Sequence, residues 1–335
     1  MHARYYVSLI LGIFVCSIVP FSLYYLYSEQ STTQAERKTV YHYEKVDGPI
    51  QPIPRKMEID TRWVNLGKAL FHSPLLSKNN TISCSSCHLV DFGGDDGFPV
   101  STGVNNAKGF RNSPTVLNSS FNFRQFWDGR ASSLSEQIAG PVHNPVEMGS
   151  SWAEIVEKLS SDSYFNKTFY SLSQHGVTRE NIVKAITTYE ESLITPNAPI
   201  DRYLLGDSAA LTEQQQRGLD HFINHGCATC HQGVNIGGNL YQKLGRVNTI
   251  PEILIQDSGK YQTSQQEQDR NVFKVPSLRN VADTGPYFHN GSVDNLPQAV
   301  RIMASSQLGR ELPEQEIEDI VALLHAFSSK VIEVQ

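Results

Sequence analysis

From Trp63 onward, apolar residues recur every three or four positions in several segments of the chain. This spacing places the apolar side chains on one face of an α-helix, whereas no series of alternating strands and hairpins stands out. Ser151, Thr178 and Thr212 are the expected N-caps of three of these helices. The fold is therefore expected to be mainly α, with long loops rich in Gly, Asn and Pro. Helices are expected over residues 62–72, 151–161, 178–193, 212–226, 297–303 and 313–327.

The N-terminus has a different pattern, because residues 5–27 contain no charged side chain. A helix of this length crosses ~30 Å of hydrocarbon, and tyrosines lie toward both of its ends, where the membrane interfaces would be. Residues 1–27 are therefore expected to be an uncleaved membrane anchor, with a cleaved signal segment as the alternative. Residues 28–60 are polar and then proline-bearing, which predicts a tether.

Length and charge narrow the class of protein. The chain has 335 residues, of which 39% are hydrophobic, so it can form two domains with separate cores. Residues 195–210 carry two prolines and a glycine between helical patterns, so we expect one domain over 61–198 and another over 199–328. The net charge of -6 argues against a nucleic-acid partner.

A Cys-x-x-Cys-His motif occurs twice. On a helical turn its three side chains share one face, so both thiols can bond to a porphyrin edge while the imidazole reaches the iron. A zinc site would need Cys-x-x-Cys pairs separated by ~15–20 residues, and a redox disulfide would need no histidine. Two c-type haems are thus favoured over a metal site or a disulfide. The two copies are Cys84, Cys87 and His88, and Cys227, Cys230 and His231.

Other positions repeat together with the haem motif. Pro114 precedes Trp127 by 13 residues, and Pro276 precedes His289 by the same 13 residues. Glycine and leucine positions follow at matching offsets in both halves. The chain is therefore expected to contain two cytochrome c-like haem domains related by duplication and a pseudo-twofold axis. The further matching pairs are Gly129 with Gly291, and Leu134 with Leu296.

These motifs carry a resemblance to a known family. The segments "RNSPTVLN", "QFWDGR", "TPNAPIDRYL", "PSLRNVA" and "PYFHNG" resemble those of bacterial di-haem cytochrome c peroxidases, over about Leu66 to Phe327. The resemblance implies reduction of hydrogen peroxide to water with electrons from a small periplasmic cytochrome c or cupredoxin. Because c-type haem is attached outside the cytoplasm, we expect the body of the chain in the periplasm, held to the inner membrane by its N-terminal segment.

The resemblance also implies roles for individual residues. The first haem would be peroxidatic and the second would transfer electrons, with Met303 as its axial ligand. Trp127 matches a tryptophan between the haems. Glu147 matches a distal acid, which suits peroxide because breaking the O–O bond requires a proton to move between its oxygens. Gln137 matches a glutamine that positions peroxide or water.

A calcium site and a dimer are implied in the same way. Asn112 and the carbonyl groups of Thr284 and Pro286 match the calcium ligands between the two domains of the family, and hard oxygen ligands suit this ion. The family tends to form homodimers.

One position departs from the family pattern. Where the family usually has a histidine that closes the resting peroxidatic haem, this chain has Val104, which cannot ligate iron. Substitution of that ligand by His143 or Asn105 is the alternative. Two other functions remain open: a related oxidase that modifies a partner protein, which has an axial tyrosine in place of Met303, and a di-haem electron carrier, which needs no Glu147.

Overall fold

The computed structural model describes residues 38–332, and within this range the chain is mainly helical, as expected. Two short antiparallel pairs of strands complete it: β1 (Val40–Tyr41) with β2 (Met57–Glu58), and β3 (Tyr241–Lys243) with β4 (Val272–Lys274). The helices are α2 (Thr61–Phe71), α3 (Leu134–Gln137), α4 (Ala139–His143), α5 (Trp152–Ser161), α6 (Ser163–Leu172), α7 (Arg179–Ser192), α8 (Pro199–Leu204), α9 (Glu213–Asn224), α10 (Tyr261–Ser264), α11 (Leu296–Leu308) and α12 (Glu314–His325).

All six expected helices are present, as α2, α5, α7, α9, α11 and α12. The three expected N-caps are confirmed, because the side chains of Ser151, Thr178 and Thr212 each accept a hydrogen bond from a backbone N–H in the first turn. The sequence pattern missed α6, where the Asp162 side chain caps the helix immediately after α5 ends. It also missed the short helices α3, α4, α8 and α10.

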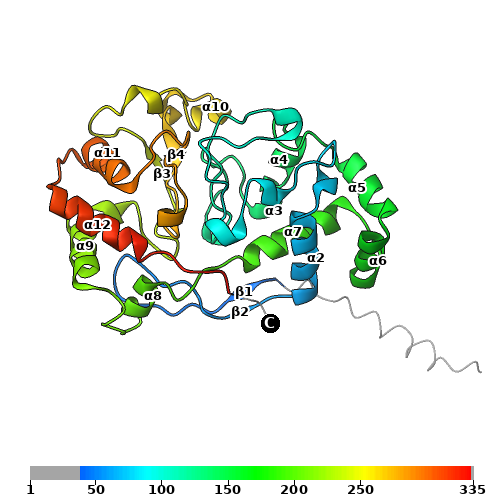
Figure 1. Ribbon diagram of the computed structural model, residues 1–335, viewed down its shortest axis with the longest axis horizontal. Coiled ribbons are helices and arrows are strands. Elements are labelled where there is room, and N and C mark those ends of the chain that lie inside the picture. The colour runs from blue at the N-terminus through cyan, green and yellow to red at the C-terminus, as the bar shows by residue number, and fades with distance from the viewer. Residues whose placement is uncertain (1–37, 333–335) are drawn as a thin grey trace, which may run out of the picture. The chain divides into compact units, whose positions relative to one another are not determined.

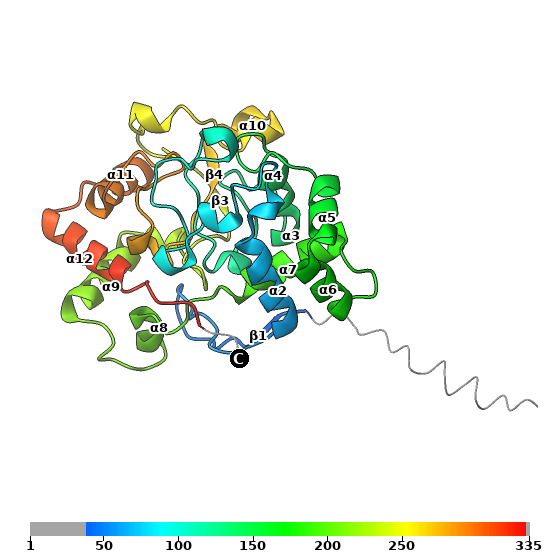
Figure 2. The ribbon, with the colours of Figure 1, turned by 45° about the vertical axis from the view of Figure 1, so that its right-hand side comes forward.

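The helices pack in two groups, each with its own core. Figure 1 shows α2, α5, α6 and α7 together and α9, α11 and α12 together, and the turned view in Figure 2 keeps this grouping. One core is formed around α2 and α7, and the other around α9 and α12. In both pairs a glycine allows close approach: a Cβ on Gly67 would lie 1.9 Å from the Ala185 carbonyl oxygen, and one on Gly218 would lie 2.0 Å from that of Asp319.

Backbone conformations repeat between the two halves, which agrees with the repeated sequence positions. Phe126 has φ 70° and Phe288 has φ 68°, which is rare for a bulky side chain. Asn118 and Asn280 both have φ 59°. A pseudo-twofold axis between the halves, and the domain limits of 61–198 and 199–328, remain predictions.

The tether expected over residues 28–60 is wrong for residues 39–60, which belong to the folded unit. Ile50 and Ile53 are buried, at 2% and 1% exposure. The Asp201 carboxylate accepts a hydrogen bond from the Ile53 N–H and pairs with the buried Arg279 guanidinium at 2.7 Å. Arg279 in turn donates to the Gln51 carbonyl oxygen. Burial of two isoleucines and a shared ion pair therefore fixes a segment whose prolines suggested a spacer.

The predicted anchor, residues 1–27, lies outside the described residues. Among the helices that the structure describes, none has the length and apolar character needed to cross a membrane.

Candidate functional site

The first Cys-x-x-Cys-His motif forms a tight turn. Cys84–Ser86 is a 3-10 turn, and the backbone N–H of His88 closes it by donating to the Cys84 carbonyl oxygen at 3.0 Å. The His88 Nδ1 lies 3.2 Å from the Gly94 carbonyl oxygen. This contact fixes the ring and leaves Nε2 as the atom available to a metal.

The second motif has the same geometry. Cys227–Thr229 is a 3-10 turn, the His231 N–H donates to the Cys227 carbonyl oxygen at 3.0 Å, and the His231 Nδ1 lies 3.3 Å from the Ile236 carbonyl oxygen. Burial lowers the pKa of His88 and lowers that of His231 to about 4. Both imidazoles are therefore neutral at neutral pH, which is the form that ligates iron.

A cavity of about 780 Å³, here called the first cavity, surrounds the first motif. The expected peroxide residues Gln137 and Glu147 both line it, although one ends α3 and the other lies in the loop after α4. The structure therefore brings together the residues expected to act on peroxide. Its lining includes Cys84, Cys87, His88, Trp127, Gln137 and Glu147.

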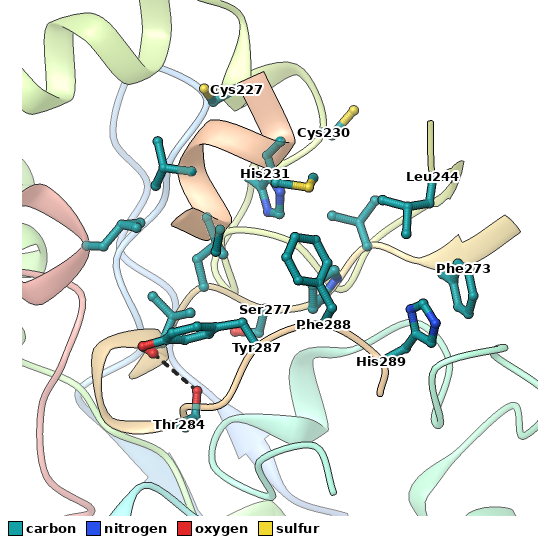
Figure 3. Close-up of a pocket in the computed structure, with 18 of the residues that line it drawn as sticks. Cys227, Cys230, His231, Leu244, Phe273, Ser277, Thr284, Tyr287, Phe288 and His289 are labelled. Carbon is teal, nitrogen blue, oxygen red and sulfur yellow. Dashed lines mark hydrogen bonds between the residues drawn. The ribbon is translucent and has the colours of Figure 1, made fainter. Parts of the chain in front are cut away.

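A second cavity, of about 270 Å³, surrounds the second motif. Figure 3 shows Cys227, Cys230 and His231 above the loop that carries Phe288 and His289. Met303, from α11, lines the same cavity as His231. The expected axial pair thus meets at one cavity, from segments more than 70 positions apart in the sequence.

Trp127 lines both cavities. Its Nε1 donates a hydrogen bond to the Asn112 carbonyl oxygen at 2.9 Å, and its own carbonyl oxygen accepts one from the Lys274 N–H in β4 at 2.8 Å. The indole is therefore bonded to the first half of the chain and the Trp127 backbone to the second half. A place for Trp127 between two haems stays a prediction.

The surroundings of Glu147 change the pKa of its carboxyl group. Burial raises the pKa of its carboxyl group above the ordinary value, although a hydrogen bond from Asn144 and the charge of Arg130 oppose this. Asn144 Nδ2 donates to Glu147 Oε1 at 2.6 Å and orients the carboxyl group. A carboxyl group with a raised pKa keeps its proton to a higher pH than an ordinary glutamate does, which suits a group that transfers protons.

Val104 is buried, at 3% exposure, and its N–H donates to the Glu147 carbonyl oxygen at 2.8 Å. Among the described residues, His88 is the only histidine that lines the first cavity. His143 instead contacts the Ser150 carbonyl oxygen through Nδ1 at 3.1 Å, and neither it nor Asn105 lines this cavity. The geometry therefore offers no support for either substitute ligand.

The residues expected at a calcium site, Asn112, Thr284 and Pro286, all line the second cavity. Asn112 is buried and its Nδ2 donates to the Phe98 carbonyl oxygen at 2.9 Å. Its side-chain oxygen takes no part in that bond, so it can still act as a ligand.

Two features of the site were missed by sequence reasoning. The Arg111 guanidinium donates to Asp128 at 2.7 Å and to Asp257 at 2.9 Å, which ties the Trp127 loop to the second half. Glu190 lines the first cavity, and burial raises its pKa to about 8. Asp257 lies in a segment without a periodic pattern, and Glu190 lies in an otherwise ordinary helix, so no local signal indicated either residue.

Comparison with known proteins decides the family. The model of the di-haem cytochrome c peroxidase family matches residues 61–209. The chain is 41% identical over 299 residues to the cytochrome c551 peroxidase of Pseudomonas aeruginosa, which covers 86% of each protein. The chain belongs to the di-haem cytochrome c peroxidase family.

Other relatives agree with this membership. The chain is 47% identical over 283 residues to the cytochrome c peroxidase Ccp of Escherichia coli, but it spans only 61% of that protein and the match covers 84% of this chain. A solved MauG-like protein associated with microbial copper homeostasis superposes with a TM-score of 0.74 at 27% identity, covering 87% of this chain and 95% of that one.

Membership in the di-haem peroxidase family implies two c-type haems, and the residues present fit them. Each cavity carries two cysteines on one turn and a neutral histidine whose Nδ1 faces a backbone carbonyl group. That arrangement provides two thioether positions and one axial nitrogen at each cavity.

Proposed function

We propose that this chain reduces hydrogen peroxide at the first cavity, consuming two electrons and two protons to form two waters. When bound, the two haems would supply the iron redox chemistry, one held by the first motif at the first cavity and the other by the second motif at the second cavity. The observation that carries the proposal is that Glu147, a half-buried acid with a raised pKa, shares a cavity with His88. An electron carrier would have no need of such an acid.

Glu147 is assigned the proton transfer. Its carboxylate takes a proton from one peroxide oxygen and delivers it to the other, which leaves as water when the O–O bond breaks. Asn144 keeps the carboxyl group oriented through its bond to Oε1. Gln137, with both an amide donor and a carbonyl acceptor, is assigned the positioning of peroxide or water from the end of α3.

The second cavity is assigned to electron entry. His231 and Met303 line it, and a histidine and methionine pair fills both axial positions and raises the potential of a haem. Met303 also argues against the related protein-modifying oxidase, which has a tyrosine there. The electron donor is proposed to be a small cytochrome c or cupredoxin, and Trp127 to lie on the route between the cavities.

A calcium ion is proposed at the Asn112 side-chain oxygen and the Thr284 and Pro286 carbonyl groups. A buried acid, Asp95, lies in the segment before Asn112. Its Oδ2 has no hydrogen-bond partner, and burial raises its pKa to about 7. The charge of Asp283 contributes to this rise. A cation would offset the cost of burying the Asp95 carboxyl group and its repulsion by Asp283.

The cellular setting is proposed from the haem chemistry and the sequence. Because c-type haem is attached outside the cytoplasm, the folded unit is assigned to the periplasm. Tethering to the inner membrane by residues 1–27, and formation of a homodimer, are proposed on the sequence alone.

Steady-state turnover tests the function. Purified protein with both haems, a reduced small cytochrome c and hydrogen peroxide should give peroxide-dependent oxidation of the cytochrome. Oxidation of the donor that does not depend on peroxide, with both haems present and reducible, would identify an electron carrier instead.

A further inference from the structure

Helix α9 carries two histidines one turn apart, on the side that packs against α12. His221 and His225 have stacked rings, with centroids 5.7 Å apart and an angle of 10° between the planes. Glu316, from the first turn of α12, faces them, and its Oε2 lies 2.7 Å from the His225 Nε2. One ligand atom from each of the three residues lies within 4.8 Å of the others.

The spacing of the two helices makes this cluster a defined site. Residues four apart on a helix lie on the same face, so His221 and His225 project together. Gly218, one turn earlier on α9, allows the backbone of α9 to contact that of α12, because a Cβ there would lie 2.0 Å from the Asp319 carbonyl oxygen. The positions of the donors are thus set by packed helices and not by a loop.

The donor atoms suit zinc. Two imidazole nitrogens and one carboxylate oxygen form a ligand set that zinc takes with a water as the fourth ligand. In a tetrahedral site with bonds of about 2.1 Å, ligand atoms stand about 3.4 Å apart, so small side-chain rotations would bring these three donors into place. The side chains of His221, His225 and Glu316 are 28%, 17% and 27% exposed, which leaves solvent access for the ion.

Asp319 lies next to the cluster, on the side of His221. Its Oδ2 lies 3.7 Å from the His221 Nε2, and the carboxylate accepts hydrogen bonds from Arg217 at 3.0 and 3.1 Å. At this distance the Asp319 charge would favour a metal-bound His221 electrostatically, and carboxylates beside ligating histidines are common around protein-bound zinc.

We propose that His221, His225 and Glu316 form a binding site for a zinc ion, separate from both haem cavities. The ion joins α9 to α12 directly before the second haem motif, since His225 precedes Cys227 by two residues. Its role is to hold these two helices together at the start of that motif.

Zinc titration of the intact protein with both haems tests this site. After treatment with EDTA and buffer exchange, calorimetry with zinc chloride should show one equivalent bound per chain, and zinc should raise the melting temperature. His221→Ala and Glu316→Gln should each weaken the binding by about 10-fold or more, because metal affinity drops at least this far when even a supporting partner is lost. His175→Ala, which replaces an exposed histidine elsewhere, should bind zinc as the natural protein does.

The site is refuted if the intact protein binds no stoichiometric zinc. It is equally refuted if His221→Ala and Glu316→Gln bind zinc as tightly as the natural sequence, because the ion would then lie elsewhere. Glu316→Gln preserves side-chain shape, so it provides the decisive measurement where His221→Ala fails to assemble with its haems. Peroxide turnover plays no part in these readouts.

Discussion

Trp127 and His289 stand edge to face, with ring centroids 6.4 Å apart and an angle of 76° between the planes. They occupy equivalent positions in the two halves, and each follows a phenylalanine with positive φ, Phe126 or Phe288. The same strained loop therefore presents an indole from one half and an imidazole from the other. Both rings line the second cavity, while only Trp127 of the pair also lines the first. This asymmetry makes Trp127 the one of the two that connects the cavities.

Replacement of Glu147 tests the proposed proton transfer. Glu147→Gln keeps the shape and the contact with Asn144 but removes the group that carries the proton. We expect both haems to be retained and peroxide turnover to drop by ~10²–10⁴, the usual contribution of a general acid or base. Glu157→Gln, at an exposed position on α5, is the control and should keep full turnover. Unchanged turnover in Glu147→Gln would remove this residue from the mechanism.

Replacement of Met303 tests the axial pair at the second cavity. Met303→Leu has similar volume but no sulfur, so we expect the potential of the second haem to drop, because methionine ligation raises it. A spectroscopic redox titration measures this change. Met57→Leu, in β2 and away from both cavities, should leave both potentials unchanged. If the potentials of Met303→Leu match those of the natural protein, Met303 is not a ligand.

The helices and the haem motifs could be predicted because their signals are local. An amphipathic period fixes α9 or α12 within about twenty residues of sequence, and a Cys-x-x-Cys-His turn contains both of its cysteines and its histidine. Contacts such as Arg111 with Asp257 join residues 146 positions apart, so no spacing in the sequence indicates them. The segment 39–60 was misread for the same reason, because its prolines are a local signal and its partner Asp201 is remote.

The ion pair that holds this segment gives a stability prediction. Arg279 and Asp201 are 0% and 1% exposed, and breaking a buried pair leaves an uncompensated charge. We expect Arg279→Met to lower the free energy of unfolding by about 3–5 kcal/mol. Arg55→Met removes an exposed pair with Glu44 and should cost at most about 1 kcal/mol. Denaturant unfolding measures the free energy of unfolding of both variants. Equal losses would mean that burial of the Arg279 ion pair adds nothing to stability.

Glu190 gives a prediction about pH. Burial raises its pKa to about 8 in the folded chain, against about 4.3 when unfolded. Between these values the folded state holds a proton that the unfolded state has lost, so stability declines as pH rises, by up to about 1.4 kcal/mol per pH unit. Glu190→Gln removes this dependence. The melting temperature of Glu190→Gln minus that of the natural protein should therefore increase from pH 5 to pH 8. If the two curves of melting temperature against pH run parallel instead, Glu190 is ionised in the folded state.

Val104 gives a prediction about the resting state of the first haem. The resemblance to the family implies that a histidine at this position would close the oxidised peroxidatic haem until the other haem is reduced. Here the position holds a buried valine, and His88 is the only described histidine that lines the first cavity. We therefore expect the fully oxidised first haem to be high-spin, with its distal side open or bound to water, and peroxide turnover to begin without prior reduction.

Val104→His tests the same prediction in the opposite direction, by restoring a histidine at this position. The Val104 N–H is bonded to the Glu147 carbonyl oxygen, and the preceding residue, Gly103, lines the first cavity, so position 104 is next in the sequence to a cavity-lining residue. We expect this variant to convert the oxidised first haem to a low-spin form and to introduce a lag that pre-reduction abolishes. Absorption and electron paramagnetic resonance spectra of the fully oxidised proteins measure the change. Two low-spin haems and a lag in the natural protein would mean that another residue already closes the site, because valine has no lone pair with which to bind iron.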